Sequence, residues 1–492
     1  SKGLRTEFPK PVLEETKKLR RPKLSTERKR REDLRDTLCF TIDPETAEDF
    51  DDAVSLVQLE NGRFELGVHI ADVSHYVREG SALDEEALER GTSVYFVDKV
   101  IPMLPEKLSN DLCRLREKTD RLAFSVIMEI DSRGTVKDYR ITESIIRSDR
   151  RFTYREVEDI IQGKNHPFSE TVHLMMMMSL VLRKAREEKG SIDFDVPVPV
   201  ISLDENGIPH EVSPSERLDA NRLVEEFMLA ANLTVARHMI ELNEKAKKKE
   251  PYPFVYRVHE KPDENEVEAF LDLLKRLGIQ YRIPGDLEPD DYRKILDIIE
   301  NLEFKDFAEK VALRSMTKAV YSTDNIGHFG LAFDAYTHFT SPIRRYPDLL
   351  VHRLLKKYAG KDAAPPPPGY KKELQQMCEQ CSQSEIQAVD AEREHIKIKS
   401  MEFLSDKVGG SYDGVIAGIT SFGFFVELNH YLIEGLVHIS ELRDDHYEYD
   451  QDNYTLSGQR HGRVFRLGDP VRVTIKQVSV EERKADFILA EG

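Results

Sequence analysis

The sequence predicts an α+β fold in which a large unit, a mixed sheet with surrounding helices, is followed by a small β-barrel of OB type. Three observations carry this prediction. Strand-like runs dominate residues 38–130, helix-like runs dominate residues 153–404, and five short strands with glycine-rich turns occupy residues 408–491. Strands followed by helices are typical of an α+β unit, and five short strands within about 80 residues fit an OB barrel.

We expect three segments: a charged lead-in over residues 1–36, a large domain over residues 37–404 and a barrel domain over residues 405–492. The lead-in has a helical piece near Val12–Leu19. The strands expected next lie within Leu38–Val77, Ser93–Val97 and Phe124–Ile130. The later helices are expected at Tyr154–Gln162, Ser169–Lys189, Arg217–Lys245, Glu264–Leu277, Asp290–Leu302, Phe304–Lys318 and Tyr370–Leu404. The barrel strands are expected at Val415–Ile419, Gly423–Leu428, Gly435–Ile439, Pro470–Lys476 and Lys484–Leu489.

Composition limits the class of protein. The chain has 492 residues, 40% of them hydrophobic and 33% charged, which predicts a soluble protein of two or three domains. No apolar run reaches the roughly 18 residues of a bilayer span, so no membrane partner is expected. Four cysteines and the lack of a signal peptide favour the cytoplasm. The net charge of −18 disfavours a polyanionic partner, but local basic clusters such as Arg28–Arg31 allow nucleic acid without indicating it.

The segment Thr41–Ala53 is the strongest chemical signal. It holds four aspartates between two apolar runs, and these are Asp43, Asp49, Asp51 and Asp52. Carboxylates this dense repel one another unless a hard cation joins them, and oxygen ligands suit Mg²⁺, with Mn²⁺ as an alternative. Two such ions about 4 Å apart would clamp the attacking and leaving oxygens of a phosphodiester. The alternative is a solvated acidic loop.

The C-terminal segment resembles an S1-type RNA-binding domain. The resemblance is carried by Ile419–Val426, with the sequence Ile-Thr-Ser-Phe-Gly-Phe-Phe-Val, and by Glu434–Ser440. It implies that Phe422, Phe425 and His438 form a platform on which RNA bases stack. The alternative is that each of these residues belongs to the core of a small barrel.

The large unit resembles the catalytic domain of the ribonuclease II family. Five separated blocks match in order: Thr41–Asp43 with Phe50–Ala53, His69–Val77, Arg90–Phe96, Ile101–Pro105 and His338–Leu349. The resemblance implies a processive 3′-to-5′ exoribonuclease that uses divalent metal and releases nucleoside 5′-monophosphates from single-stranded RNA. It also implies no nucleotide cofactor, and we expect a monomer.

The resemblance assigns a role to each candidate catalytic residue. Asp43 and Asp52 would ligate Mg²⁺ at the scissile phosphate, and Asp49 and Asp51 would complete the site. Arg344 would neutralise charge on the phosphate during hydrolysis. Arg345 would contact RNA as well. The alternative is that one of the two arginines merely forms a salt bridge with the acidic cluster, and for Arg345 this alternative is equal. Both arginines follow Ser341-Pro342, a helix-start signal, while Pro347 suggests that the helix begins a few residues later.

Four further RNA contacts are implied by the resemblance. Tyr95 and Phe194 would sandwich the terminal bases, and Tyr154 would line the catalytic cavity. Glu225 would touch the terminal ribose, which would separate RNA from DNA. Because Glu225 lies on an amphipathic helix, a solvated surface position is the alternative for it.

One departure and two alternatives stay open. Relatives carry cold-shock-type domains before the catalytic domain, and this chain begins almost at the catalytic domain, which indicates either a shortened chain or a member without them. The first alternative function is a non-catalytic RNA-binding scaffold with the same fold. The second is a nuclease that acts on DNA or cuts internally. Four aspartates kept together with Arg344 favour the exoribonuclease.

Overall fold

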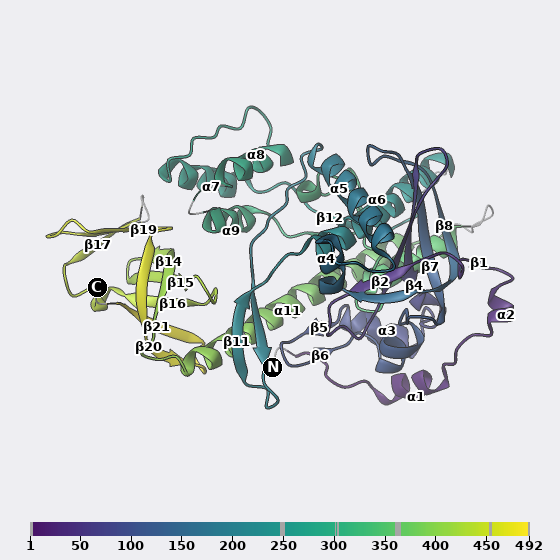
Figure 1. Cartoon of the computed structure of the whole chain (residues 1–492), viewed down its shortest axis with the longest axis horizontal. Coiled ribbons are helices and arrows are strands. Elements are labelled where there is room, and N and C mark those ends of the chain that lie inside the picture. Colours follow the sequence, from purple (N-terminus) through teal and green to yellow (C-terminus); the bar gives the residue numbers. More distant parts are fainter. Residues whose placement is uncertain are drawn as a thin grey trace.

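The chain folds into a large α+β unit and a small β-barrel, joined by one long helix, α11 (Tyr370–Ser405). The computed structural model describes residues 3–246, 251–300, 302, 305–359, 366–451 and 455–490. In Figure 1 α11 runs from the large unit to the barrel, which lies at the opposite end of the molecule. The predicted fold class is therefore confirmed.

A seven-stranded mixed sheet forms the centre of the large unit. In spatial order its strands are β1 (Glu32–Asp33), β8 (Val136–Arg147), β7 (Asp120–Ile130), β4 (Phe64–Ala71), β3 (Asp52–Gln58), β2 (Phe40–Asp43) and β9 (Arg150–Thr153). The two outer pairs, β1–β8 and β2–β9, are parallel, and the inner pairs are antiparallel. Sequence patterning did not predict β8, because much of this long strand is polar and half-exposed and shows no clean hydrophobic alternation.

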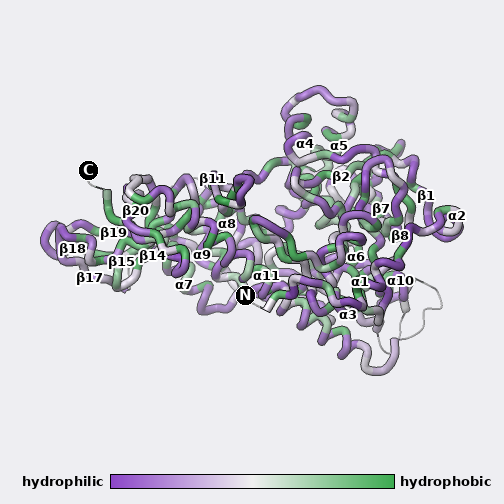
Figure 2. The backbone as a smooth tube through the Cα atoms, turned by 90° about the horizontal axis from the view of Figure 1, so that it is seen from below, coloured by the Kyte–Doolittle hydropathy of each residue, from purple (hydrophilic) through white to green (hydrophobic). Residues whose placement is uncertain are grey.

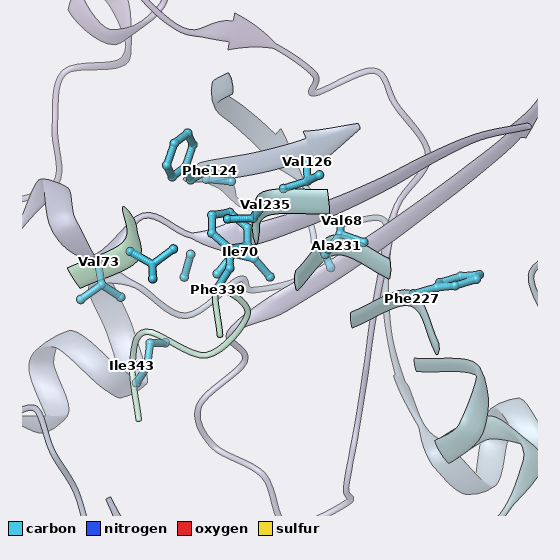
Figure 3. Close-up of a cluster of buried hydrophobic side chains, with 14 of the residues drawn as sticks. Val68, Ile70, Val73, Phe124, Val126, Phe227, Ala231, Val235, Phe339 and Ile343 are labelled. Carbon is cyan, nitrogen blue, oxygen red and sulfur yellow. The ribbon is translucent and has the colours of Figure 1, made fainter. Parts of the chain in front are cut away.

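Helices pack against the sheet and bury its central strands. The helices up to α6 are α1 (Lys10–Lys18), α2 (Leu24–Glu27), α3 (Ala82–Arg90), α4 (Tyr154–Ile161), α5 (Ser169–Glu187) and α6 (Asp219–Ala246). Figure 3 shows Ala231 and Val235 of α6 beside Val68 and Val126 of the sheet. This interdigitation of apolar side chains supplies the main core of the domain.

The remaining helices of the large unit form two groups. The first group has its own small core and contains α7 (Glu264–Arg276), α8 (Pro289–Ile299) and α9 (Lys305–Ser315). The second is α10 (Tyr346–Tyr358), which is almost wholly buried and belongs to the main core. Short strand pairs complete the unit: β5 (Val94–Tyr95) with β6 (Val100–Ile101), β10 (Pro199–Leu203) with β11 (Pro209–Pro214), and β12 (Tyr256–Val258) with β13 (Val320–Ser322).

The C-terminal segment closes into the predicted five-stranded barrel. Its strands, in spatial order, are β14 (Ser411–Thr420), β15 (Gly423–Leu428), β16 (Glu434–His438), β21 (Lys484–Leu489) and β20 (Pro470–Ser479). A further three-stranded sheet, which the sequence did not predict, lies between the third and fourth barrel strands in the chain and consists of β17 (Tyr447–Asp450), β18 (Thr455–Gly458) and β19 (Val464–Arg466). The outer end of this sheet is hydrophilic (Figure 2). Across the described part of the chain, every helix is too short or too polar to span a bilayer.

Candidate active site

The four aspartates of the predicted cluster lie at one end of the central sheet. Asp43 is the last residue of β2 and Asp52 the first residue of β3, and Asp49 and Asp51 lie in the loop between them. Because β2 and β3 are antiparallel neighbours, the loop brings Asp51 and Asp52 back to the edge at which Asp43 lies. Asp43 and Asp51 are buried, while Asp49 and Asp52 are partly exposed.

The cluster is electrostatically unfavourable without a cation. Burial raises the pKa of Asp43 to about 8, and the neighbouring Asp52 carboxylate adds to this rise. Burial also raises the pKa of Asp52 to about 6, although Arg344 and Arg345 oppose it. The pKa of Asp51 lies well above its usual value for the same reason, with Asp49 as the repelling neighbour. Carboxyl groups in such a setting ionise readily only when positive charge joins them.

The donor set of this loop suits a divalent cation. Asp43 Oδ2 is buried without a hydrogen-bond partner, so one carboxylate oxygen is available at the centre of the cluster. As they stand, however, no three acidic, histidine or cysteine side chains among the described residues are arranged to hold a metal ion. Two of the four carboxylates are engaged elsewhere, because Tyr95 Oη donates to Asp49 Oδ2 at 3.0 Å and Ile343 N donates to Asp51 Oδ1 at 2.9 Å. Each of these bonds uses one carboxylate oxygen, so Asp49 Oδ1 and Asp51 Oδ2 could still bind an ion after the side chains move together.

Arg344 and Arg345 lie in the turn before α10, and their side chains differ in exposure. The helix begins at Tyr346, with Pro347 in its first turn, a few residues after Ser341-Pro342 as Pro347 had suggested. Arg344 is exposed, and among the described residues its guanidinium donates only to Ser341 Oγ, at 3.2 Å. Its backbone oxygen accepts from Ser93 N at 2.9 Å, which joins this turn to the strand that carries Tyr95. Arg344 is thus held by its backbone while its charge remains available.

Arg345 forms an internal salt bridge, but its partner is Asp348 of α10 rather than the aspartate cluster named in the alternative to RNA contact. Its Nη2 lies 2.7 Å from Oδ1 of Asp348, whose side chain is fully buried. The same oxygen accepts from Ser341 N at 2.8 Å. These bonds hold the turn that presents Arg344, so Arg345 has a structural role whether or not it also contacts RNA.

Tyr95 and Tyr154 adjoin the aspartate loop. Tyr95 is 38% exposed, and besides its bond to Asp49 its backbone N donates to Glu392 Oε1 of α11 at 2.7 Å. Tyr154 begins α4, which is held by a capping box. Burial raises the pKa of Tyr154, and Asp52 and Asp43 are the next largest causes, so its hydroxyl lies in the field of the cluster.

Phe194 and Glu225 lie on a neighbouring wall of the large unit. Phe194 belongs to a segment without regular secondary structure and packs, partly buried, against the α7–α9 core. Glu225 lies on α6, where Oε2 accepts from Arg217 Nη2 at 2.8 Å. The same guanidinium donates to Asp193 Oδ1 at 2.7 Å, so Arg217 joins Glu225 to the residue preceding Phe194.

Sequence reasoning missed two residues at the site. Glu392 lies in the field of Arg344 and bonds to the backbone of Tyr95, but it is one of many charged residues on a polar helix. Arg151 donates through Nη2 to the carbonyl oxygens of Pro44 and Glu45, at 3.0 and 2.9 Å. Only the fold brings these residues to the loop, and no local pattern marks them.

The predicted RNA platform lies on one face of the barrel. Phe422 is 46% exposed and Phe425 is partly buried, with ring centroids 6.3 Å apart and nearly perpendicular. His438 is exposed, and it pairs in register with Gly423, the residue that directly follows Phe422. Phe424, in contrast, points into the barrel core. A cavity of about 610 Å³ between α11 and the barrel is lined in part by both outward rings.

Fold and site together define a nucleic-acid hydrolase, in which a carboxylate cluster beside an exposed arginine is joined to an OB barrel. Residues 31–361 match the model of the RNB domain, and residues 405–489 match that of the S1 RNA binding domain. Ribonuclease R of Aquifex aeolicus is 44% identical over 99% of this chain and 69% of its own length, and ribonuclease R of Thermotoga maritima is 42% identical over 99% and 68%. The structure of Mycoplasma genitalium RNase R in complex with ribose methylated single-stranded RNA aligns with a TM-score of 0.92 at 28% identity, covering 99% of this chain and 76% of that one.

The chain therefore belongs to the RNB family, in the ribonuclease R branch of 3′-to-5′ exoribonucleases.

Proposed function

We propose that the chain degrades single-stranded RNA processively from its 3′ end and releases nucleoside 5′-monophosphates at the aspartate loop. The observation that carries this proposal is the meeting of Asp43, Asp49, Asp51 and Asp52 with the exposed Arg344 at one edge of the sheet. RNA decay and quality control is the cellular role that such an activity would serve. We also propose that the chain acts as a cytoplasmic monomer and needs no nucleotide cofactor.

The aspartates would hold Mg²⁺, or alternatively Mn²⁺, through carboxylate oxygens that include the unpartnered Asp43 Oδ2. When bound, the ion would supply Lewis-acid polarisation of the phosphate and a more acidic water. The exposed guanidinium of Arg344 is suited to neutralise the non-bridging phosphate oxygens, because an arginine fork matches phosphate geometry. Its backbone oxygen accepts from Ser93 N and Thr92 Oγ1, just before β5, and these bonds would keep Arg344 in place while the RNA advances.

The path of the RNA would follow the aromatic residues. Tyr95 and Phe194 would stack the terminal bases, Tyr154 would line the cavity and Glu225 would contact the terminal ribose. Farther along the strand, Phe422, Phe425 and His438 of the barrel would hold upstream bases. Stacking accepts any base, which suits an enzyme that must move along every sequence.

A direct test incubates the protein with Mg²⁺ and a 5′-labelled single-stranded RNA. The expected product pattern is a ladder that collapses to one short end product and is abolished by a chelator. Asp51→Asn should slow the reaction by roughly 100-fold or more, a loss of the size seen when a key electrostatic group is removed from an active site. Glu48→Gln is the matched control, because Glu48 lies in the same loop, is exposed and bonds only to Asn110 among the described residues.

The same assay separates the alternatives. A DNA oligomer of the same sequence, and an RNA with a blocked 3′ end, should both persist. Cleavage of either would favour a nuclease that acts on DNA or cuts internally. Tight RNA binding with no shortening in the unaltered protein would favour the non-catalytic scaffold.

A further inference from the structure

The loop between β2 and β3 has no regular secondary structure of its own, yet it must hold its aspartates in place. Pro44, Glu45 and Glu48 are exposed, and Ala47 alone of residues 44–48 is an apolar side chain packed against the main core, so packing holds this stretch only weakly. Its ordered anchor on this side is Arg151 of β9, whose Nη2 donates to the carbonyl oxygens of both Pro44 and Glu45. One guanidinium nitrogen therefore joins two consecutive backbone groups immediately after Asp43.

Phe50, near the other end of the loop, is held by the same arginine. Its ring is 3% exposed, with the guanidinium carbons of Arg114 and Arg151 at 4.0 and 4.9 Å from its centroid. Its carbonyl oxygen accepts from Leu115 N at 3.1 Å. Guanidinium groups are attracted to the face of an aromatic ring, so both arginines fix the residue immediately before Asp51.

Arg114 and Arg151 do not serve as partners in ion pairs within the ranges that the structure describes. Neither forms a salt bridge with a carboxylate there, whereas the neighbouring Arg150 pairs with Glu156 at 2.9 Å. Lysine would not replace Arg151, since it lacks the planar group that packs on the ring while it donates to the loop.

We propose that Arg151, assisted by Arg114, is a positioning residue that holds the aspartate loop in the shape a divalent cation requires. The inference rests on the proposed function, because it takes the aspartates as the metal ligands. In this role Arg151 acts on the loop and not on the RNA phosphate, because its Nη2 donates to the backbone of Pro44 and Glu45. It acts through the backbone on either side of the cluster, in the manner of the groups that orient metal ligands from outside.

The test measures Mn²⁺ binding to the RNA-free protein by isothermal titration calorimetry. Arg151→Met keeps the length of the side chain but removes the guanidinium, and should weaken Mn²⁺ binding by about 10-fold, the lower end for groups that orient ligands. Arg151→Lys should restore only part of the affinity, and Arg114→Met, which loses only the ring contact, should have a smaller effect than Arg151→Met. RNA affinity in the presence of a chelator should be unchanged, and saturating Mn²⁺ should recover most of the hydrolysis rate.

Arg150→Met is the matched control, because it removes the adjacent guanidinium without touching the loop, and it should leave Mn²⁺ binding unchanged. Unaltered metal affinity in Arg151→Met, or an equal loss in Arg150→Met, would overturn the inference even if the unaltered protein binds Mn²⁺ and degrades RNA. Failure of the unaltered protein to bind Mn²⁺ would instead overturn the metal site itself, and this inference with it. Thermal unfolding of each variant separates a loosened loop from a destabilised domain.

Discussion

Replacing Asp72 with asparagine should destabilise the large unit more than a surface change, because it removes the fully buried carboxylate that Arg31 and Lys356 share. Arg31 would keep its ion pairs with Glu27 and Glu143, and Lys356 would keep its ion pair with Glu143. Asp72 is fully buried at the end of β4. Its carboxylate accepts from Arg31 Nη2 at 2.6 Å and from Lys356 Nζ at 2.6 and 2.7 Å. These contacts join the lead-in, the sheet and α10, the helix that follows Arg344.

The magnitude follows from this geometry. Removing one partner of a buried ion pair costs about 3–5 kcal/mol when the remaining charge is left without compensation. Because Glu27 and Glu143 still pair with the two cations, we expect the lower end, about 3 kcal/mol. The RNB match spans residues 31–361. For about 330 residues, an unfolding entropy of about 2.1 cal/mol/K per residue gives roughly 0.7 kcal/mol/K, so Tm should fall by about 4 °C. Calorimetry and urea titration of Asp72→Asn measure both quantities.

Acid titration gives a second check on Asp72. Burial alone would raise its pKa, but Lys356 and Arg31 hold it well below the usual value. The folded carboxyl therefore releases its proton more easily than the unfolded one, and its stabilising contribution is present above about pH 4 and is lost as the pH falls. The difference in the free energy of unfolding between the unaltered protein and Asp72→Asn should become smaller below pH 4. If Asp72→Asn lowers the free energy of unfolding by less than about 1 kcal/mol at pH 7, or if the difference between the two proteins grows in acid, the argument from the buried carboxylate is refuted.

Three further outcomes are expected. Tyr95→Leu should weaken the binding of a short RNA by about 5–150-fold, the equivalent of one stacked base at 1–3 kcal/mol. Tyr95→Phe should change the affinity by less than about threefold, because it loses only the partly exposed hydrogen bond to Asp49. Equal losses of affinity in the two variants would contradict stacking. Phe422→Ala should weaken binding of long RNAs and leave the shortest substrates unaffected, as measured by fluorescence anisotropy across a length series. Burial lowers the pKa of His69 to about 4, so on acidification the unfolded chain takes up a proton before the folded chain does. The free energy of unfolding should therefore fall between pH 6.5 and 4 by about 3 kcal/mol more in the unaltered protein than in His69→Asn. Identical pH profiles of the two proteins in urea titration would exclude this role of His69.

The parts of the site that could be predicted from sequence are those whose chemistry is local. Four aspartates within ten residues can be recognised from the sequence alone, because carboxylates this close repel one another unless a cation lies between them. The barrel was predictable for a similar reason, since its five strands show hydrophobic alternation and most of the turns between them contain glycine. The polar strand β8 and the sheet β17–β19 were not predictable, because their stability comes from pairing with neighbours rather than from a hydrophobic pattern of their own.

Contacts between distant segments lie beyond sequence patterning. Tyr95 meets Glu392 across 297 positions, and Ile343 meets Asp51 across 292. Each partner is unremarkable in its own segment: one glutamate on a charged helix, one backbone amide in a turn. Only the packing of α10 and α11 against the sheet turns them into parts of one site.

Arg344 and Arg345 show how far a motif can specify function. The two residues are chemically identical and adjacent, so their different roles were implied by the family resemblance and not by any local property of the sequence. The difference comes from Asp348, one turn along α10, whose buried carboxylate binds Arg345 and leaves Arg344 in solvent. A buried anion needs one cation beside it, and once that requirement is met by Arg345 the second guanidinium is free for an external phosphate. Both arginines of the motif are therefore needed: Arg345 pairs with the buried Asp348, and this leaves the Arg344 guanidinium exposed.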